Sequence, residues 1–191
     1  MRIRSTKVKL IRTFRSDEQA NTDTIMKADT DSMLIRKFDE ATDTGSLRDC
    51  LIELQEFERG IDSRMPAGEE IADAYMSDMF LQCAMSKGSI FVADLEGHVA
   101  GFVTLLSQCS SGELDDGDIE FALVSDIVVR EECRGSGTGR MLLECAEKQA
   151  REDGARWLRV SVLARNKLAR ELYESAGFSE LYVDFEKVLT P

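Results

Sequence analysis

Hydrophobic and polar residues alternate with two different periods along this chain, and the change of period outlines an α/β fold. Residues 43–61 and 68–88 carry apolar residues at helical spacing, so we expect two amphipathic helices after a first strand in 33–38. Asp43 or Thr44 is available as the first N-cap, and Gly88 as the stop of the second helix. Two strand-like runs flank Leu95-Glu96-Gly97-His98, which predicts a β-hairpin over 89–106.

The second half of the chain repeats strands and helices in alternation. A polar loop, 107–117, leads to a long strand over 118–129, and a helix over 140–153 ends at Gly154. A strand over 156–163, a helix over 166–177 and a terminal strand within 179–189 follow. We therefore predict a basic and polar tail, residues 1–32, followed by one α/β domain over 33–191.

Composition and charge narrow the class of protein. No run approaches the roughly 20 apolar residues of a membrane helix. The five cysteines are odd in number and form no C-x-x-C pair, which argues against a disulfide framework or a zinc site and indicates a cytoplasmic protein. Residues 1–16 hold six basic residues and no acid, which leaves 18 basic and 36 acidic residues in the rest. This balance disfavours nucleic acid and suits either a cationic ligand or simply a solvated surface.

A glycine-rich stretch, Arg-Gly-Ser-Gly-Thr-Gly at 134–139, lies between the long strand and the helix that follows it. A strand, a glycine loop and a helix N-terminus together form an anion site, because the first helical amides lack internal partners. The same glycines could equally serve a tight turn. The loop has neither the G-K-[ST] of a Walker A motif nor the G-x-G-x-x-G spacing of a dinucleotide site, so another phosphate-bearing ligand is expected.

The helix over 166–177 carries a second pattern. Asn166, Ala169 and Tyr173 share one face, on which Ala169 leaves room for a ligand. Taken alone, Asn166 could be an N-cap and Tyr173 a half-buried aromatic residue.

The glycine loop (Arg134 to Leu143) and the Asn166 to Phe178 segment together strongly resemble the GNAT superfamily of acyl-CoA N-acyltransferases. The resemblance implies a mixed central sheet with splayed central strands flanked by helices. It also implies that acetyl-CoA is the co-substrate, that the loop amides hold its pyrophosphate, and that the long strand pairs with its pantetheine arm. The residues expected to bind it are Ile127, Val128, Val129, Arg134, Gly135, Ser136, Gly137, Thr138, Gly139, Arg140, Asn166, Ala169 and Tyr173.

The resemblance predicts direct transfer of an acetyl group to a primary amine, with Tyr173 as the acid that protonates the thiolate. An amide near Val128 or Val129 is the expected donor to the carbonyl oxygen. Counting along the strand from Val129 puts no carboxylate on the corresponding face, and a bulge would be needed to exchange the faces. The base is therefore expected to be a water held by Glu120 or Ser125, with Asp126 as the alternative.

The acceptor is less well defined by the sequence. A group of acids near the first helix, Glu56, Glu58, Asp62 and Glu69, favours a small cationic amine. Only 13 residues follow Phe178, so the acceptor rim is short, open, or completed by a second subunit in a homodimer. Transfer to a protein N-terminus or lysine, and an acyl-CoA-binding regulatory module without catalysis, stay open as alternatives. Trp157 and Cys133 are expected to pack in the core, and His98 to lie at a surface turn.

Overall fold

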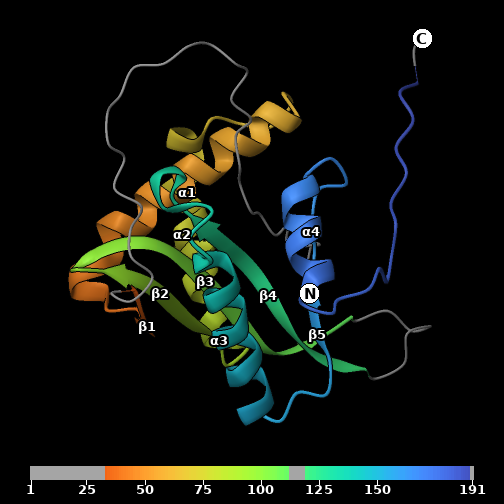
Figure 1. Cartoon of the computed structure of the whole chain (residues 1–191). Helices are drawn as coiled ribbons and strands as arrows, with labels where there is room; N and C mark the ends of the chain where they lie inside the picture. Colours follow the sequence, from red (N-terminus) through yellow and green to blue (C-terminus); the bar gives the residue numbers. More distant parts are fainter. Residues whose placement is uncertain (1–32, 112–118, 190–191) are drawn as a thin grey trace.

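The computed structural model describes residues 33–111 and 119–189, and Figure 1 shows their helices and strands in chain order. The predicted tail, residues 1–32, and most of the predicted polar loop lie outside this range. The described elements are β1 (Met33–Lys37), α1 (Glu40–Ile61), α2 (Gly68–Met85), β2 (Ser89–Leu95), β3 (His98–Ser110), β4 (Glu120–Val129), the 3-10 helix η2 (Glu131–Cys133), α3 (Thr138–Glu152), β5 (Leu158–Val160) and α4 (Lys167–Ser175).

The strands form one mixed sheet in the order β1-β2-β3-β4-β5. Neighbours from β1 to β4 are antiparallel, whereas β5 lies parallel to β4. The ladder between β4 and β5 covers only Ala122–Val124 and Leu158–Val160, although β4 continues to Val129. The two strands share only the first part of β4, which confirms the predicted mixed sheet with splayed central strands.

Two pairs of helices cover the two faces of the sheet (Figure 1). On one face α1 and α2 pack against the sheet in a core that includes Leu47, Phe102 and Val128. On the other face α3 and α4 pack in a second core that includes Leu142 and Ile127. The chain therefore forms three layers with the sheet in the middle, as the alternation of strands and helices predicts.

The first helix begins earlier than the sequence suggested. Its N-cap is Asp39, whose carboxylate accepts a hydrogen bond from the Ala41 amide at 3.0 Å, and not Asp43 or Thr44. Asp43 lies one turn inside the helix, where it is 2% exposed and forms an ion pair with Arg36 of β1 at 2.6 Å. The acid at 43 thus ties the helix to the sheet edge instead of capping it.

Three strand boundaries also differ from the prediction. β3 continues to Ser110, because it pairs with the start of β4 in a long hairpin. β5 has three residues where eight were expected, because it leaves β4 after Val160, and Trp157 just before it is 61% exposed and not part of the core. Residues 179–189 form no strand, and their large apolar side chains are exposed.

β4 contains a bulge that changes which face its residues occupy. Thr104 of β3 pairs with Asp126, but the next residue, Leu105, pairs with Val124. Ser125 is therefore an additional residue in β4 that has no pairing partner in β3.

The bulge reverses the alternation that simple counting assumes. Ile127 lies in the core on the α3 and α4 side, and so does Val124, whereas counting put Leu123 on the face of Ile127. Leu123 instead belongs to a small separate cluster. The bulge thus exchanges the faces of the residues before Ser125, whereas Asp126 stays on the face opposite to Ile127, where Tyr75 of α2 donates to it.

Candidate active site

A glycine loop joins the end of β4 to α3, beyond the part of β4 that pairs with β5. The chain passes through the 3-10 helix η2, and α3 begins at Thr138. Gly135 and Gly137 have φ angles of 77° and 89°, in the left-handed region that side chains disfavour. A Cβ built at either glycine would meet no atom within 4 Å. The loop therefore offers bare backbone, with open space over it, to a ligand.

The start of α3 also offers hydrogen-bond donors. Gly137 is the N-cap residue, and no side chain caps the helix. The amides of Arg140 and Met141 donate to the Gly137 carbonyl, whereas the amides of residues 135–139 donate no backbone hydrogen bond to any residue that the structure describes. Unused amides at the positive end of a helix dipole form a site for an anion such as a phosphate group.

Contacts inside the protein hold the loop in this shape. The Arg134 Nε donates to the Val129 carbonyl at 3.0 Å, and its Nη2 pairs with Glu53 of α1. The Ser136 hydroxyl donates to the Cys133 carbonyl at 2.6 Å. The Arg134 side chain, predicted to bind the coenzyme, is only 9% exposed, so its guanidinium serves as an anchor of the loop.

The face of α4 that the sequence singled out is buried and turned inward. Asn166, Ala169 and Tyr173 are 2%, 0% and 4% exposed. The side-chain oxygen of Asn166, Oδ1, accepts from the Ala169 amide at 3.2 Å, so Asn166 is indeed the N-cap of α4. Its Nδ2 group and the Tyr173 hydroxyl are buried and have no hydrogen-bond partner among the described residues. Since buried polar groups are nearly always bonded, these two unused groups suit a ligand that lies along α4.

A contact between α3 and α4 brings the two predicted motifs together. The Arg140 Nη2 lies 3.1 Å from the Ser175 hydroxyl, so the first turn of α3 meets the last turn of α4. The Tyr173 ring packs on Phe178, with 5.9 Å between the ring centroids. The glycine loop and the Asn166 to Tyr173 face therefore border one region. The last residues of β4 that were predicted to bind the coenzyme, 127–129, lie beyond its ladder with β5.

The bulge of β4 carries a buried carboxylate with two hydroxyl donors. Asp126 is 1% exposed. The Tyr75 hydroxyl, from α2, donates to its Oδ1 at 2.5 Å, and the Ser125 hydroxyl donates to its Oδ2 at 2.8 Å. The carboxylate therefore lies in the middle of the sheet, held in one orientation by residues of two elements.

Electrostatics link this carboxylate to α4. Burial raises the pKa of Tyr173 well above its usual range, and the negative charge of Asp126 raises it further. Burial likewise raises the pKa of Tyr75, followed by the charge of Asp126, its hydrogen bond and the charge of Glu58. Both phenols consequently stay protonated at physiological pH, and both are close enough to Asp126 to sense its charge.

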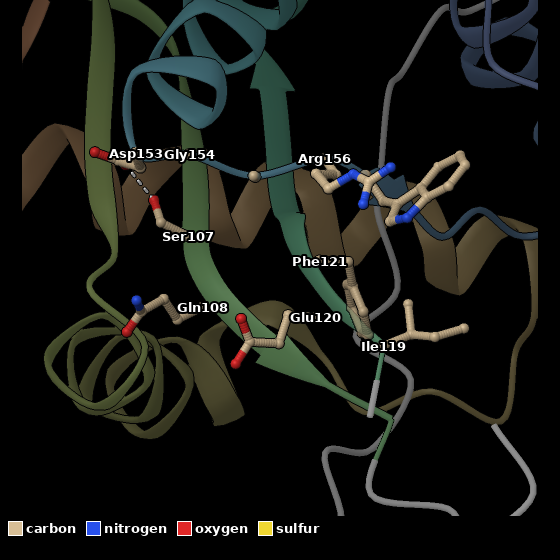
Figure 2. A pocket seen from close by; sticks show the side chains of 10 residues that line it. Ser107, Gln108, Ile119, Glu120, Phe121, Asp153, Gly154 and Arg156 are labelled. Atoms are coloured by element: carbon tan, nitrogen blue, oxygen red, sulfur yellow. Dashed lines mark hydrogen bonds between the residues drawn. The ribbon is translucent and has the colours of Figure 1, made fainter. Parts of the chain in front are cut away.

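Glu120, an alternative candidate for the base, lies apart from this cluster. It is the first residue of β4, six residues before Asp126, which corresponds to about 20 Å along a strand. Figure 2 shows Glu120 beside an open cavity of about 400 Å³, near Gln108 and the hydrogen bond from Ser107 to Asp153 at 2.5 Å. The structure therefore separates Glu120 from Asp126, whereas Ser125 and Asp126 are joined by a hydrogen bond between their side chains.

The four acids near the first helix have different roles in the structure. Glu58 is 1% exposed. Glu56 accepts a hydrogen bond from the Gly68 amide at 2.7 Å, and Asp62 and Glu69 form ion pairs with arginines. Of this group only Glu58 is buried beside the Asp126 cluster, as its effect on the pKa of Tyr75 indicates.

Two residues of the site were not predicted from the sequence. Tyr75 lies three residues after Ala72 and four before Met79, both buried, so a hydroxyl on the buried stripe of α2 was the available signal. Glu53 gave no such signal, because an acid on a helix is usually solvated. The expected minor roles agree with the structure for Cys133, which is 9% exposed with a pKa raised by burial, and for His98, which is exposed at the hairpin.

Two kinds of feature, a membrane-crossing helix and a metal-binding cluster, are absent from the part of the chain that the structure describes. Neither 33–111 nor 119–189 contains a helix with the length and apolar character needed to cross a membrane. The same residues contain no cluster of three or more His, Cys, Asp or Glu side chains arranged to hold a metal ion. All five cysteines are free thiols.

Comparison with known proteins gives concordant matches. Residues 54–178 match the Acetyltransferase (GNAT) family. YhfO from Bacillus subtilis (strain 168), described as an uncharacterized N-acetyltransferase, is 27% identical over 113 residues, which are 58% of this chain and 73% of YhfO. YycN from the same organism, described in the same words, is 38% identical over 68 residues, 36% of this chain and 44% of YycN. The structure of a putative acetyl transferase from Pyrococcus furiosus superimposes with a TM-score of 0.62 at 23% identity, over 82% of this chain and 99% of that one.

Proposed function

Because this chain belongs to the GNAT acetyltransferase family, we propose that it is an N-acetyltransferase that moves the acetyl group of acetyl-CoA directly to a primary amine. The observation that carries the proposal is the pairing of two unused sets of groups. The unused backbone amides of the glycine loop, at Gly135 and Gly137, suit the pyrophosphate of the coenzyme. The buried, unbonded Nδ2 of Asn166 and hydroxyl of Tyr173 suit its pantetheine arm and its sulfur.

The residues present fit acetyl-CoA in chemistry as well as in position. The amides of residues 135–139 would hold the pyrophosphate, since a helix N-terminus favours negative charge, whereas the Arg140 amide, also predicted to bind it, already donates to the Gly137 carbonyl. Asn166 Nδ2 would donate to an amide carbonyl of the pantetheine arm, and the last residues of β4 would pair with that arm as a strand does. The bound thioester supplies an activated acetyl group, and the protein supplies orientation and proton transfer.

The attacking amine must be neutral, and a free alkylamine has a pKa of about 10.4. We assign the proton acceptor to Asp126, because it is the carboxylate on the bulge whose charge reaches Tyr173. Hydrogen bonds from Tyr75 and Ser125 fix its orientation. This assignment favours the alternative candidate for the base over a water held by Glu120.

Tyr173 would supply the proton for the departing thiolate. Its pKa is raised, so the phenol is protonated over the whole range in which enzymes are usually assayed. A phenol with a pKa above the roughly 8.5 of a thiol gives up its proton only late in bond cleavage, which limits its contribution to the rate. An amide of Val128 or Val129 would stabilise the carbonyl oxygen as negative charge develops on it.

A small cationic amine is the acceptor class we favour. Two carboxylates, Asp126 and Glu58, are each 1% exposed and both act on Tyr75, so the interior of the site is acidic. The whole chain has a formal net charge of −12, which would attract a cation over a longer range. A protein N-terminus or a lysine side chain presents the same ammonium group and is the second candidate.

Calorimetric titration with CoA, followed by thiol release from acetyl-CoA with a panel of amines, tests the proposal. Gly137→Glu should abolish CoA binding, because it puts a side chain and a negative charge where the pyrophosphate belongs. Gly154→Glu is a matched control: Gly154 has a φ of 86° and open space around it, but lies at the other end of α3. Absence of binding to the unmodified protein, or equal loss in both variants, would refute the loop assignment.

The same assays separate the proposal from its rivals. CoA binding without thiol release across the amine panel would indicate a regulatory module that has lost catalysis. Mass spectrometry of acetylated lysate proteins, compared with acetylated metabolites, would separate a protein acceptor from a small amine.

A further inference from the structure

A carboxylate of α1 bonds to the part of the chain that leads into the glycine loop. The backbone amide of Glu131, the first residue of η2, donates to Glu53 Oε1 at 2.8 Å, and the Arg134 Nη2 pairs with the same oxygen. Figure 1 shows this connection, between β4 and α3, lying beside α1. Glu53 therefore holds both ends of the stretch 131–134, which Gly135 follows directly.

The same stretch is also tied to the sheet. The Arg134 Nε donates to the carbonyl of Val129, the last residue of β4, at 3.0 Å, and the Arg134 amide donates to the Glu131 carbonyl at 3.2 Å. The guanidinium of Arg134 is therefore held between α1 on one side and the end of β4 on the other. This arrangement fixes the position from which the glycine loop starts.

The ion pair between Glu53 and Arg134 is largely shielded from water. The two side chains are 29% and 9% exposed. A neighbouring pair, Asp49 with Arg130, has its charged atoms 3.5 Å apart and side chains that are 63% and 25% exposed. Exposed pairs contribute little, whereas removing one partner of a buried pair leaves the other charge uncompensated. Loss of the charge at Glu53 should therefore disturb its surroundings far more than loss of the charge at Asp49.

The glycine loop depends on such support because its own backbone is permissive. Gly135 and Gly137 have positive φ angles and open space over them, and glycine has access to more backbone conformations than any other residue. When a site must adopt one conformation before it binds, its apparent affinity falls with the fraction of molecules in that conformation. A contact that fixes the start of the loop consequently raises the affinity for the ligand of the loop.

We propose that Glu53 is a positioning residue for the coenzyme, which acts by holding Arg134 and the Glu131 amide so that the glycine loop keeps the conformation that binds pyrophosphate. This role rests on the proposed function. Glu53 acts through Arg134 and not on the reacting atoms, so it should determine the affinity for acetyl-CoA and leave the chemical step unaffected. The helix that contributes Glu58 beside Asp126 thus also supports the coenzyme side of the site.

Glu53→Gln tests the role, because it keeps a side-chain oxygen for the Glu131 amide but removes the charge opposite Arg134. A hydrogen bond between charged groups is worth roughly 10- to 100-fold in an equilibrium constant, so we expect the Kd for CoA to rise about 10-fold or more. The KM for acetyl-CoA should rise with it, with little change in kcat. Asp49→Asn is the matched control, one turn earlier on α1, and should change neither constant. An unchanged Kd in Glu53→Gln, or an equal rise in both variants, would overturn the proposal.

A double-mutant cycle shows whether the ion pair carries the effect. Arg134→Gln is measured alone and combined with Glu53→Gln. If the two side chains act through their contact, the combined variant should lose less CoA affinity than the product of the two single losses. Losses that multiply would show that the two side chains act independently, which contradicts the proposal. If Glu53→Gln does not fold, as thermal unfolding would show, Glu53→Asp replaces it and the same outcomes apply, because a shorter side chain also breaks the contact.

The unmodified protein separates this role from the proposed function. If it does not bind CoA, the proposed function fails, and the role of Glu53 fails with it. If it binds CoA and releases thiol, while Glu53→Gln shows the same Kd and KM, only the role of Glu53 is refuted.

Discussion

Replacing Tyr173 by phenylalanine should change activity and stability in opposite directions. The Tyr173 hydroxyl is buried and unbonded among the described residues, and a buried polar group without a partner costs about 1–3 kcal/mol. Tyr173→Phe removes that cost and keeps the ring on Phe178, so we expect the free energy of unfolding to stay equal or rise by about 1 kcal/mol. For a domain of this size that corresponds to an increase in Tm of about 2–4 °C.

Turnover should fall in the same variant. General acid catalysis typically contributes about 10²- to 10⁴-fold, but a thiolate leaves readily and the raised pKa of Tyr173 makes it a late donor, so we expect a loss of roughly 10- to 100-fold. The loss should shrink at lower pH, where solvent supplies the proton, and the unmodified enzyme should show no alkaline decline from Tyr173 below about pH 10. Thiol release is measured under conditions in which chemistry limits the rate, alongside thermal unfolding and CoA affinity. Unchanged turnover, or a lowered Tm, would refute the role of an unbonded hydroxyl that acts only on the ligand.

Three further changes probe the base, the first helix and the sheet. Asp126→Asn should lower kcat by about 10²-fold or more with CoA affinity retained, whereas Glu120→Gln should leave kcat unchanged. The reverse pattern would show that Glu120, and not Asp126, holds the catalytic base. The ion pair with Arg36 lowers the pKa of Asp43 to about 2, so Asp43→Asn should lower the free energy of unfolding by about 1–2 kcal/mol at pH 7. A lowered pKa stabilises the fold fully only above the pKa of the unfolded state, near 4. The difference between the two proteins, measured by denaturant unfolding, should therefore disappear as the pH falls from about 4 to about 2. Gly101→Ala should destabilise by about 1–3 kcal/mol in the same assay, because its Cβ would lie closer than 3.0 Å to a carbonyl oxygen of β4, and a neutral result would contradict that close approach.

The sequence predicted the architecture well wherever a long periodic pattern or a glycine carries the information. The helical stripe of α1, the Gly97 turn and the loop before α3 all have local causes, namely side-chain spacing and a positive φ. The common face of Asn166 and Tyr173 follows from helix geometry in the same way.

Features that depend on distant partners could not be predicted in this way. The orientation of Asp126 depends on a bulge set by pairing with β3, and its partner Tyr75 arrives from a helix 51 residues earlier. A terminal strand was predicted within 179–189 from the alternation of residue types, but these residues form no strand in the structure. A strand requires an edge with which to pair as well as an alternation.

The single additional residue in β4 also bears on how readily a protein of this kind can change its function during evolution. Deleting one codon, that of Ser125, would bring Val124 directly before Asp126, so the bulge would disappear while Thr104 still pairs with Asp126 and Leu105 with Val124. Both hydrophobic cores would remain and Asp126 would keep the hydrogen bond from Tyr75, but the carboxylate would lose the Ser125 hydroxyl as a donor. A lineage could thus keep the fold, the coenzyme loop and the carboxylate while changing the hydrogen bonding of that carboxylate in one step, and this strand is the place to look when relatives of different activity are compared.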